Sequence, residues 1–133
     1  MPKPIATISG GVACAFPNVC MTPVPGSAPV AIPYPNIGQL SSAGGESTVK
    51  AGGHAVITTA HSISTTSGSE AGTNNNTKAN PPDFKGEVKF DEASSSVKVK
   101  GEGVVRLLDA TKQNNEGAVG KVLGGFPTVL VGD

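Results

Sequence analysis

Four side chains in this chain of 133 residues are of the types that proteins use to bind zinc: Cys14, Cys20, His54 and His61. Two thiolates and two imidazoles match in number the ligands of a closed tetrahedral zinc site. The spacings Cys-x5-Cys and His-x6-His lie outside the usual zinc-finger windows. The sequence therefore allows two interpretations. Either the four residues hold one zinc ion, or Cys20 is a buried thiol, Cys14 is partly buried and both histidines lie at the surface.

The other reactive side chains do not form a catalytic pattern. Cys20 could pair with a histidine as a nucleophile, but it lies among prolines and no orienting carboxylate accompanies it. Glu70 and Asp109 could pair for acid–base chemistry, yet both are expected in turns, where carboxylates accept backbone N–H bonds. Arg106 is expected to bridge a carboxylate rather than to bind a substrate. No glycine-rich phosphate loop opens a helix, so we expect a protein that is not an enzyme.

The elements that must position these side chains are predicted to be short strands. The chain has 15 Val but only 5 Leu, together with 18 Gly and 11 Pro. Valine favours strands, whereas glycine and proline favour turns. We therefore predict a single all-β domain over residues 1–133, a small cone or prism of short strands and hairpins with long loops and a thin core.

Charge and hydropathy exclude several functions. Ten basic residues balance ten acidic ones, so no basic stripe is available to bind nucleic acid. No apolar run reaches the 18 residues of a membrane span. Residues 1–9 lack the apolar core of a secretory signal peptide, which indicates synthesis in the cytoplasm. In that compartment the two cysteines are expected to be thiols or metal ligands rather than a structural disulfide. If the two cysteines alone lie close together, the alternative is a disulfide formed after export to an oxidising compartment.

Residues 13–37 form a segment with six prolines and interleaved apolar side chains. Proline restricts itself and the preceding residue to extended conformations. Because a solvated linker would not carry Phe16, Ile32 or Tyr34, we predict an extended strap laid over the core. We also expect the ring of Tyr34 to pack on that core with its hydroxyl hydrogen-bonded.

Two similar hairpins are predicted over residues 46–63 and 95–109, with an exposed polar loop at 64–83 between them and a polar connection after them. Residues 47–57 align with 95–105 at an offset of 48, and five of the eleven positions are identical. Gly52-Gly53 suits a tight turn with positive φ. The ending 128–132 resembles a truncated third copy, and copies this small must pack on one another. The alternative is independent use of the same hairpin chemistry.

Five motifs follow one another along the chain: FPNVCMTP at 16–23, IPYPNI at 32–37, SGSEAGT at 67–73, VKVKG at 97–101 and VRLLD at 105–109. In this order they resemble the PAAR-like proteins with a PIPY motif, which belong to type VI secretion and related contractile injection systems. The positions that match the family are Pro17, Val19, Cys20, Thr22, Pro23, Pro33, Tyr34, Pro35, Asn36, Glu70, Gly72, Arg106 and Asp109.

This resemblance implies a β-rich cone that caps the trimeric VgrG spike, one tip per trimer, and sharpens it for membrane piercing. It implies an effector or its adaptor chaperone as a further partner, and transient membrane contact on injection. The protein would be loaded on the secretion apparatus in the cytoplasm and exported to the periplasm or cytoplasm of a target cell. Since the chain ends at Asp133, just after its last predicted strand, we expect no fused toxin.

The resemblance bears on zinc as well. PAAR proteins bind zinc near the tip, mostly through histidines, whereas the PIPY branch usually has Lys in place of His54 and a small residue in place of His61. One zinc ion is thus the only cofactor that the sequence suggests. The alternative function is a small stand-alone effector or metal-binding module with the same fold, for which a polar cleft with convergent titratable groups would be required.

Overall fold

The structure is a computed structural model in which residues 2–68, 86–113 and 118–132 are described. These residues form strands and loops with one short 3-10 turn, so the all-β prediction is confirmed. The elements are β1 (Lys3–Ile5), β2 (Val12–Val24), β3 (Ser27–Gln39), η1 (Leu40–Ser42), β4 (Glu46–Ala51), β5 (His54–Val56), β6 (Ser62–Ile63), β7 (Val88–Phe90), β8 (Lys98–Val99), β9 (Glu102–Gly103), β10 (Ala110–Gln113), β11 (Ala118–Leu123) and β12 (Phe126–Val131).

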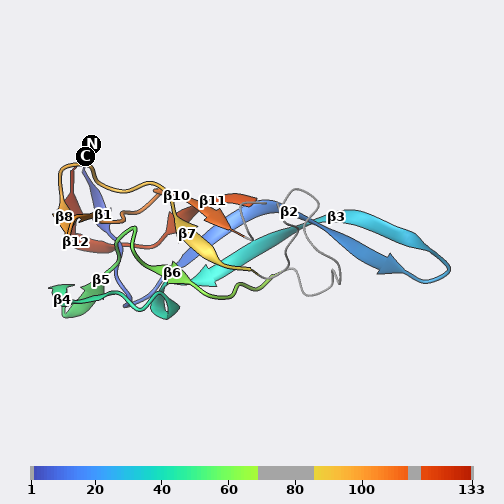
Figure 1. The fold of residues 1–133 in the computed structure, drawn as a ribbon, viewed down its shortest axis with the longest axis horizontal. Helices are drawn as coiled ribbons and strands as arrows, with labels where there is room; N and C mark the ends of the chain where they lie inside the picture. The colour runs from blue at the N-terminus through green and yellow to red at the C-terminus, as the bar shows by residue number, and fades with distance from the viewer. Residues whose placement is uncertain (1, 69–85, 114–117, 133) are drawn as a thin grey trace.

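The molecule is elongated, and its two ends are built differently (Figure 1). A six-stranded antiparallel sheet, with strand order β3-β2-β11-β10-β7-β6, forms the body. β2 and β3 continue beyond it as a two-stranded hairpin at one end. The opposite end holds three two-stranded sheets, β1–β12, β4–β5 and β8–β9, and both chain termini lie there. We call this region the three-sheet end.

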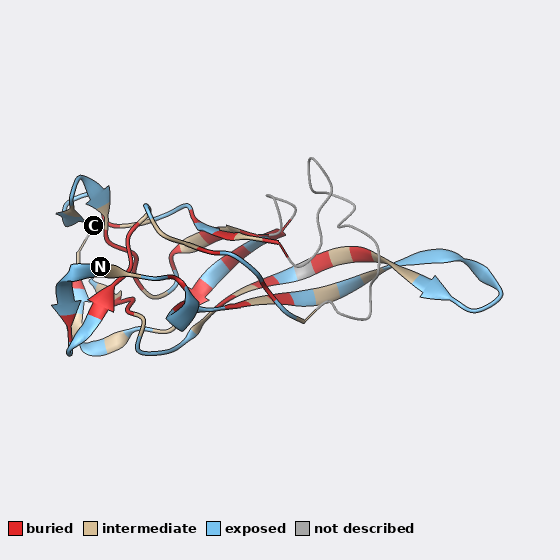
Figure 2. Cartoon of the chain, turned by 60° about the horizontal axis from the view of Figure 1, so that its bottom comes forward, coloured by how far each residue is buried: buried red, intermediate tan, exposed pale blue. Residues whose placement is uncertain are grey.

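The proline-rich segment is a hairpin and not the strap that its sequence predicts. β2 and β3 pair with each other from Val12↔Gln39 to Val24↔Ser27, and residues 12–15 of β2 also pair with β11. The connection is Pro25-Gly26, with φ of +73° at the glycine, which fits a type II turn. Pairing within the segment satisfies backbone groups that a strap would have to satisfy against the core. Residues 23–31 are consequently exposed (Figure 2).

The prolines of β3 do not interrupt the hairpin because of their place in the register. Pro33 lies opposite Val19. Proline has no N–H, so this pair is one of the non-hydrogen-bonded pairs, whose N–H positions point away from the partner strand. Pro29 and Pro35 are even numbers of residues from Pro33 and share that outward edge. β3 is an edge strand, where prolines are tolerated and discourage pairing with other chains.

Two clusters of small aliphatic side chains form the core, in the half of the molecule away from the hairpin tip (Figure 2). The first joins the body to the three-sheet end and contains Ala6, Ala13, Leu40, Ala43, Ile57, Ile63, Val88, Phe90, Val105 and Val122. The second lies within the three-sheet end and contains Ile5, Ala51, Val56, Val104 and Val131. Phe90 is the one aromatic side chain in these buried sets, so the core is thin.

The polar stretch 111–120 is the least well predicted part of the fold. Its described residues belong to β10 and β11 rather than to a connection. Gln113 is buried because its side chain donates a hydrogen bond to Thr111. Gly120 is required because a Cβ there would overlap the carbonyl of Cys14 on β2. Of the polar loop predicted over 64–83, only residues 64–68 are described, and Glu70 and Gly72 lie outside the described residues.

Candidate functional site

Three segments that are far apart in the sequence meet at the three-sheet end in a closed ring of hydrogen bonds. The N–H of Ala6 donates to the carbonyl of Val105 at 2.9 Å, that of Val105 to Ile57 at 2.9 Å, and that of Ile57 to Ala6 at 3.1 Å. All three residues are completely buried. Each segment donates to one neighbour and accepts from the other, which is the arrangement that a threefold axis produces.

A second ring joins the same three segments, with the donors and acceptors running in the opposite direction. Its hydrogen bonds run from Ile8 N to Ala55 O at 3.1 Å, from Thr59 N to Gly103 O at 3.1 Å, and from Leu107 N to Pro4 O at 2.8 Å. Three isolated β-bridges join the same segments in pairs: Ile5↔Arg106, Thr7↔Val56 and Thr58↔Val104. Residues 3–10, 54–61 and 102–109 are therefore structurally equivalent, and they surround a pseudo-threefold axis.

The third copy of the repeat is divided between the two ends of the chain. In the first two copies an outer strand, β4 or β8, leads through a tight turn into an inner strand, β5 or β9. The turns are Gly52-Gly53 and Lys100-Gly101, and φ is positive at all four residues, as a type I′ turn requires. In the third copy β12 is the outer strand and β1 the inner one, with Lys3 opposite Val131. The N-terminal residues thus complete the copy that looks truncated in the sequence.

The three copies are joined by contacts at equivalent positions, where the turn of one copy meets the start of the next outer strand. The pairs are Gly52 under the ring of Phe126, Lys100 Nζ at 3.3 Å from Glu46 Oε1, and Gly132 O accepting from Ser94 Oγ at 2.7 Å. One backbone arrangement is kept while its chemistry changes from packing to an ion pair to a hydrogen bond.

The pKa of the Glu46 carboxyl, at the start of β4, is shifted from its ordinary value. Hydrogen bonds from the hydroxyl and the backbone N–H of Thr48 lower the pKa of the Glu46 carboxyl, and Lys100 adds to the effect. The carboxylate is therefore favoured in the folded protein.

Asp109 is the centre of a buried charge cluster between the second and third copies. Its carboxylate accepts the Nε and Nη2 of Arg106, each at 3.0 Å, the backbone N–H of Arg106 at 2.8 Å, and Lys3 Nζ at 2.7 Å. Arg106 Nη1 also donates to the carbonyl of Gly132 at 3.0 Å. These charge-assisted bonds tie residues near both chain ends to one carboxylate.

His61 takes the place of Asp109 in the first copy. Its Nδ1 accepts the backbone N–H of Thr58 at 3.0 Å, and the Thr58 hydroxyl lies 3.1 Å from the same nitrogen. An imidazole nitrogen thus replaces a carboxylate oxygen as the acceptor of one turn. This explains the histidine without a metal.

The four predicted zinc ligands are not brought together. Cys14 and Cys20 are six residues apart on β2, which separates them by about 20 Å in an extended strand and excludes a disulfide between them. His54 is exposed on β5, and His61 is half-buried. In residues 2–68, 86–113 and 118–132, no group of three His, Cys, Asp or Glu side chains could hold a metal ion. Cys20 is buried and Cys14 partly buried, as the second interpretation predicts, whereas His61 is half-buried and not at the surface as that interpretation had it.

The family-motif asparagines anchor the hairpin to the body. Asn36 donates to Gln113 Oε1 at 2.9 Å, and its Oδ1 accepts from Asn18 at 3.3 Å and from Thr66 at 2.9 Å. Gln113 in turn donates to Thr111 at 3.0 Å. All five side chains are buried. Of these five residues, only Asn36 was singled out from the sequence. Thr111 and Gln113 are two positions apart, and this spacing could have predicted that both face the same side of a strand.

The remaining motif residues shape the hairpin itself. The hydroxyls of Tyr34 and Thr22 lie 2.6 Å apart across the two strands, so the predicted hydrogen bond of Tyr34 is present. Its ring is half-buried and belongs to neither core cluster, because the hairpin that carries it leaves the body. Val19 faces Pro33 in the register, and Pro23 and Pro35 are exposed; the side chain of Pro17 is not described.

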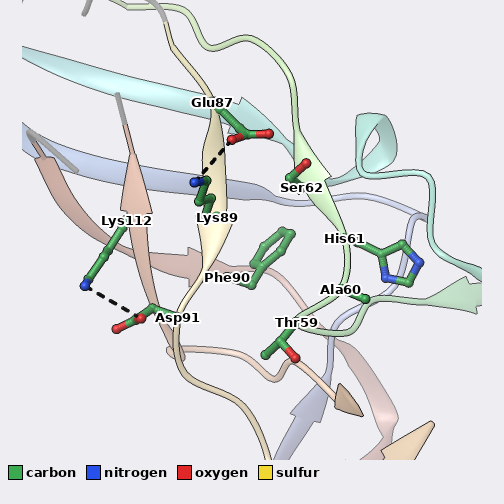
Figure 3. Close-up of a pocket in the computed structure, with 9 residues that line it drawn as sticks. All are labelled: Thr59, Ala60, His61, Ser62, Glu87, Lys89, Phe90, Asp91 and Lys112. Carbon is green, nitrogen blue, oxygen red and sulfur yellow. Dashed lines mark ion pairs between the residues drawn. The ribbon is translucent and has the colours of Figure 1, made fainter. Parts of the chain in front are cut away.

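A surface depression of about 430 Å³ lies beside β6 and β7 (Figure 3). Its lining residues are Thr59, Ala60, His61, Ser62, Glu87, Lys89, Phe90, Asp91 and Lys112. Two exposed ion pairs lie along it, Lys89–Glu87 and Lys112–Asp91, each with 3.9 Å between nitrogen and oxygen. No hydrogen bond joins a hydroxyl of this lining to a base within it, so the depression offers no assembled nucleophile.

Comparison with known proteins gives one family. The model of the family described as toxin PAAR-like domain matches residues 11–120, that is 110 of the 133 residues. The match covers the hairpin, the body and two of the three repeat copies. No curated protein and no solved structure matches the chain. In the described part of the chain, no helix is long and apolar enough to cross a membrane.

Proposed function

Because this chain belongs to the toxin PAAR-like domain family, and is thus related to the spike proteins of type VI secretion, we propose that it caps a trimeric VgrG spike. One chain would bind one trimer and form the tip of the injected needle. Its three-sheet end would face the spike, and the β2–β3 hairpin would point away from the spike, at the front of the needle.

The pseudo-threefold rings of hydrogen bonds carry this proposal. A single chain can contact three identical subunits equally only if it presents three equivalent surfaces to them. Residues 3–10, 54–61 and 102–109 set this symmetry around one axis, and the outer strands β12, β4 and β8 that pair with them present three equivalent surfaces. The opposite end is a single hairpin, which lacks the threefold symmetry needed to contact three subunits equally.

Strand addition is the mode of docking that fits the three-sheet end. Within the described residues, the outer strands β4, β8 and β12 each pair with one strand only. Each therefore keeps one edge of N–H and C=O groups that a strand of the spike could pair with. Three such edges would receive one strand from each spike subunit.

The hairpin end fits a leading position. Residues 4–45 contain no Asp, Glu, Lys, Arg or His, so this end could touch a membrane during injection without desolvating a charge. We propose no catalytic role for the chain; the toxic activity would belong to an effector that the chain carries directly or through an adaptor chaperone.

Native mass spectrometry of the chain mixed with its cognate spike tests this function. We expect a complex of one chain per three spike subunits, and no binding of a second or third chain. A chain that stays free at micromolar concentrations of spike, or that binds three per trimer, would contradict the proposal.

A further inference from the structure

The three outer strands share an irregularity that the symmetry of the fold does not require. In β4 the register jumps from Glu46↔Val56 to Lys50↔Ala55, which leaves residues 47–49 looped out. In β12 the jump from Phe126↔Ile5 to Leu130↔Pro4 leaves out residues 127–129. Ahead of β8, Val104 bonds both sides of the same irregularity: its carbonyl accepts from Ser94 N and its N–H donates to Val97 O. Pairing resumes at Lys98↔Gly103, so residues 95–97 have no partner in the register, although Val97 keeps that hydrogen bond.

Each of these bulges ends in the same dipeptide, a hydroxyl residue followed by valine. The dipeptides are Thr48-Val49, Ser96-Val97 and Thr128-Val129. A bulge of the same length at three equivalent places is a designed feature of a sheet rather than a defect. Bulges commonly re-aim a side chain toward a partner.

The valines continue the apolar cluster of the three-sheet end outward. Val129 packs against the cluster formed by Ile5, Val56 and Val104. Its equivalents are more exposed, Val49 by 38% and Val97 by 41%. The described chain thus leaves apolar surface uncovered at corresponding positions on the strands with open edges.

We propose that Val49, Val97 and Val129 are the apolar anchors of docking, each covered by one subunit of the spike. This rests on the proposed function and deepens it, since it names the side chains that recognise the trimer. The partner surface would be an uncharged or acidic apolar patch repeated three times, because Lys50 and Lys98 follow two of the valines.

A second copy of this chain is a poorer occupant of the same surface. Face-to-face pairing of two three-sheet ends would bring Lys50 and Lys98 of both copies together, with like charges opposed. Lysines on an edge strand also discourage pairing of that strand with its own kind. A trimer without these basic residues does not meet this obstacle.

Affinity measurements with the cognate spike trimer test the proposal. Val49→Asp and Val97→Asp should each weaken binding about tenfold, and the double variant about a hundredfold, as loss of buried apolar anchors does. Val119→Asp is the matched control, because Val119 is 68% exposed on β11, outside the three-sheet end; it should bind within twofold of the wild type. A Val49→Thr/Val97→Thr variant of nearly unchanged shape repeats the test if an Asp variant does not fold.

The outcomes separate the proposal from the function on which it rests. Folded valine variants that bind the spike as tightly as the wild type would overturn the anchors while leaving spike capping intact. Failure of the wild type to bind would overturn both. If the chain alone forms a dimer in sedimentation that the valine substitutions abolish, the occupant is a second copy and the proposal is wrong.

Discussion

The three-sheet end and the β2–β3 hairpin use opposite strategies to hold short strands together. The three-sheet end assembles strands of two to six residues, and its rings of hydrogen bonds join segments that lie about fifty to a hundred residues apart in the chain. The hairpin pairs two 13-residue strands that are neighbours in sequence. The first is stable only as a closed ring, whereas the second forms from one local turn.

Charge separates the two regions in the same way. The ion pairs Lys3–Asp109, Arg106–Asp109 and Lys100–Glu46 all belong to the three-sheet end, whereas the hairpin has no ionisable Asp, Glu, Lys, Arg or His. The hairpin depends instead on amides, hydroxyls and proline. Substitutions should therefore destabilise the three-sheet end mainly through its ion pairs and the hairpin mainly through its uncharged hydrogen bonds.

The largest effect is expected at the buried carboxylate of the three-sheet end. Asp109→Ala leaves the guanidinium of Arg106 buried, at 4% exposure, with its ion-pair partner removed. Loss of one partner of a buried ion pair costs about 3–5 kcal/mol of unfolding free energy. Urea denaturation monitored by circular dichroism measures it.

His61→Ala is the matched control for that substitution, because His61 has the equivalent place in the first copy. It removes a neutral acceptor from Thr58, so we expect a loss of only about 1 kcal/mol. Equal losses for the two variants would show that the buried charge adds nothing to the turn.

The next effect belongs to the hairpin. Asn36→Ala removes the residue that receives Asn18 and Thr66 and donates to Gln113, all in buried surroundings. We expect a loss of about 2–3 kcal/mol, since buried polar groups are left without this partner. Gln39→Ala, an exposed change on the same strand, should cost less than about 0.5 kcal/mol. If both variants have the same denaturation midpoint, the amide network does not hold the hairpin.

Two neighbouring glycines distinguish packing between copies from turn geometry. Gly53→Ala places a Cβ in open space, and its cost of about 1–2 kcal/mol comes from positive φ alone. Gly52→Ala has the same backbone penalty, and its Cβ also overlaps the ring of Phe126. We expect a further loss of about 1 kcal/mol or more for Gly52→Ala. Identical melting temperatures would contradict the contact between the first and third copies.

A smaller effect is expected from the hydroxyl pair of the hairpin. Tyr34→Phe removes the bond to Thr22 and should cost about 0.5–1.5 kcal/mol. Because the ring is only half-buried, Tyr34→Ala should cost less than the roughly 3–5 kcal/mol of a buried aromatic. Thr22→Val, which removes the same bond from the other strand, should match Tyr34→Phe. A Tyr34→Ala variant that does not fold would show that the ring belongs to the core.

The smallest effect is a pH dependence at the three-sheet end. The pKa of Glu46 is lowered by Thr48 and Lys100, so its carboxylate stabilises the fold above the unfolded pKa. That contribution is lost as pH falls through the lower folded pKa. NMR titration should give a midpoint below 4.5 for Glu46, and Thr48→Ala should move it upward. An unchanged midpoint in Thr48→Ala would contradict the hydrogen bonds as the cause.

The sequence predicts the local features of both regions better than their assembly. The Gly52-Gly53 turn and the repeat at 47–57 and 95–105 are readable because tight turns have strong residue preferences. That the third copy joins β12 to β1 is not readable, because an alignment along the chain does not connect its two ends. The closed ring of Ala6, Ile57 and Val105 depends on that connection.

The errors in reading the hairpin and the metal site have physical causes. Prolines suggested a strap, but at every second position of an edge strand they cost no ladder hydrogen bond. Zinc was predicted only because the chain has four potential ligands, Cys14, Cys20, His54 and His61. The number of such residues does not show that the fold brings them together. The hydrogen bond from the Thr58 N–H to the His61 ring could have been inferred, because His61 aligns with Asp109, which was expected to accept such a bond in a turn.

Hydrogen–deuterium exchange of the chain with and without its cognate spike trimer tests the central claim most directly. If the three-sheet end caps the spike, backbone amides of β4, β8 and β12 should all become protected in the complex. Amides near the hairpin turn at Pro25-Gly26 should exchange as fast as in the free chain. Protection of the hairpin turn with unchanged exchange in the three outer strands would reverse the orientation and contradict the account.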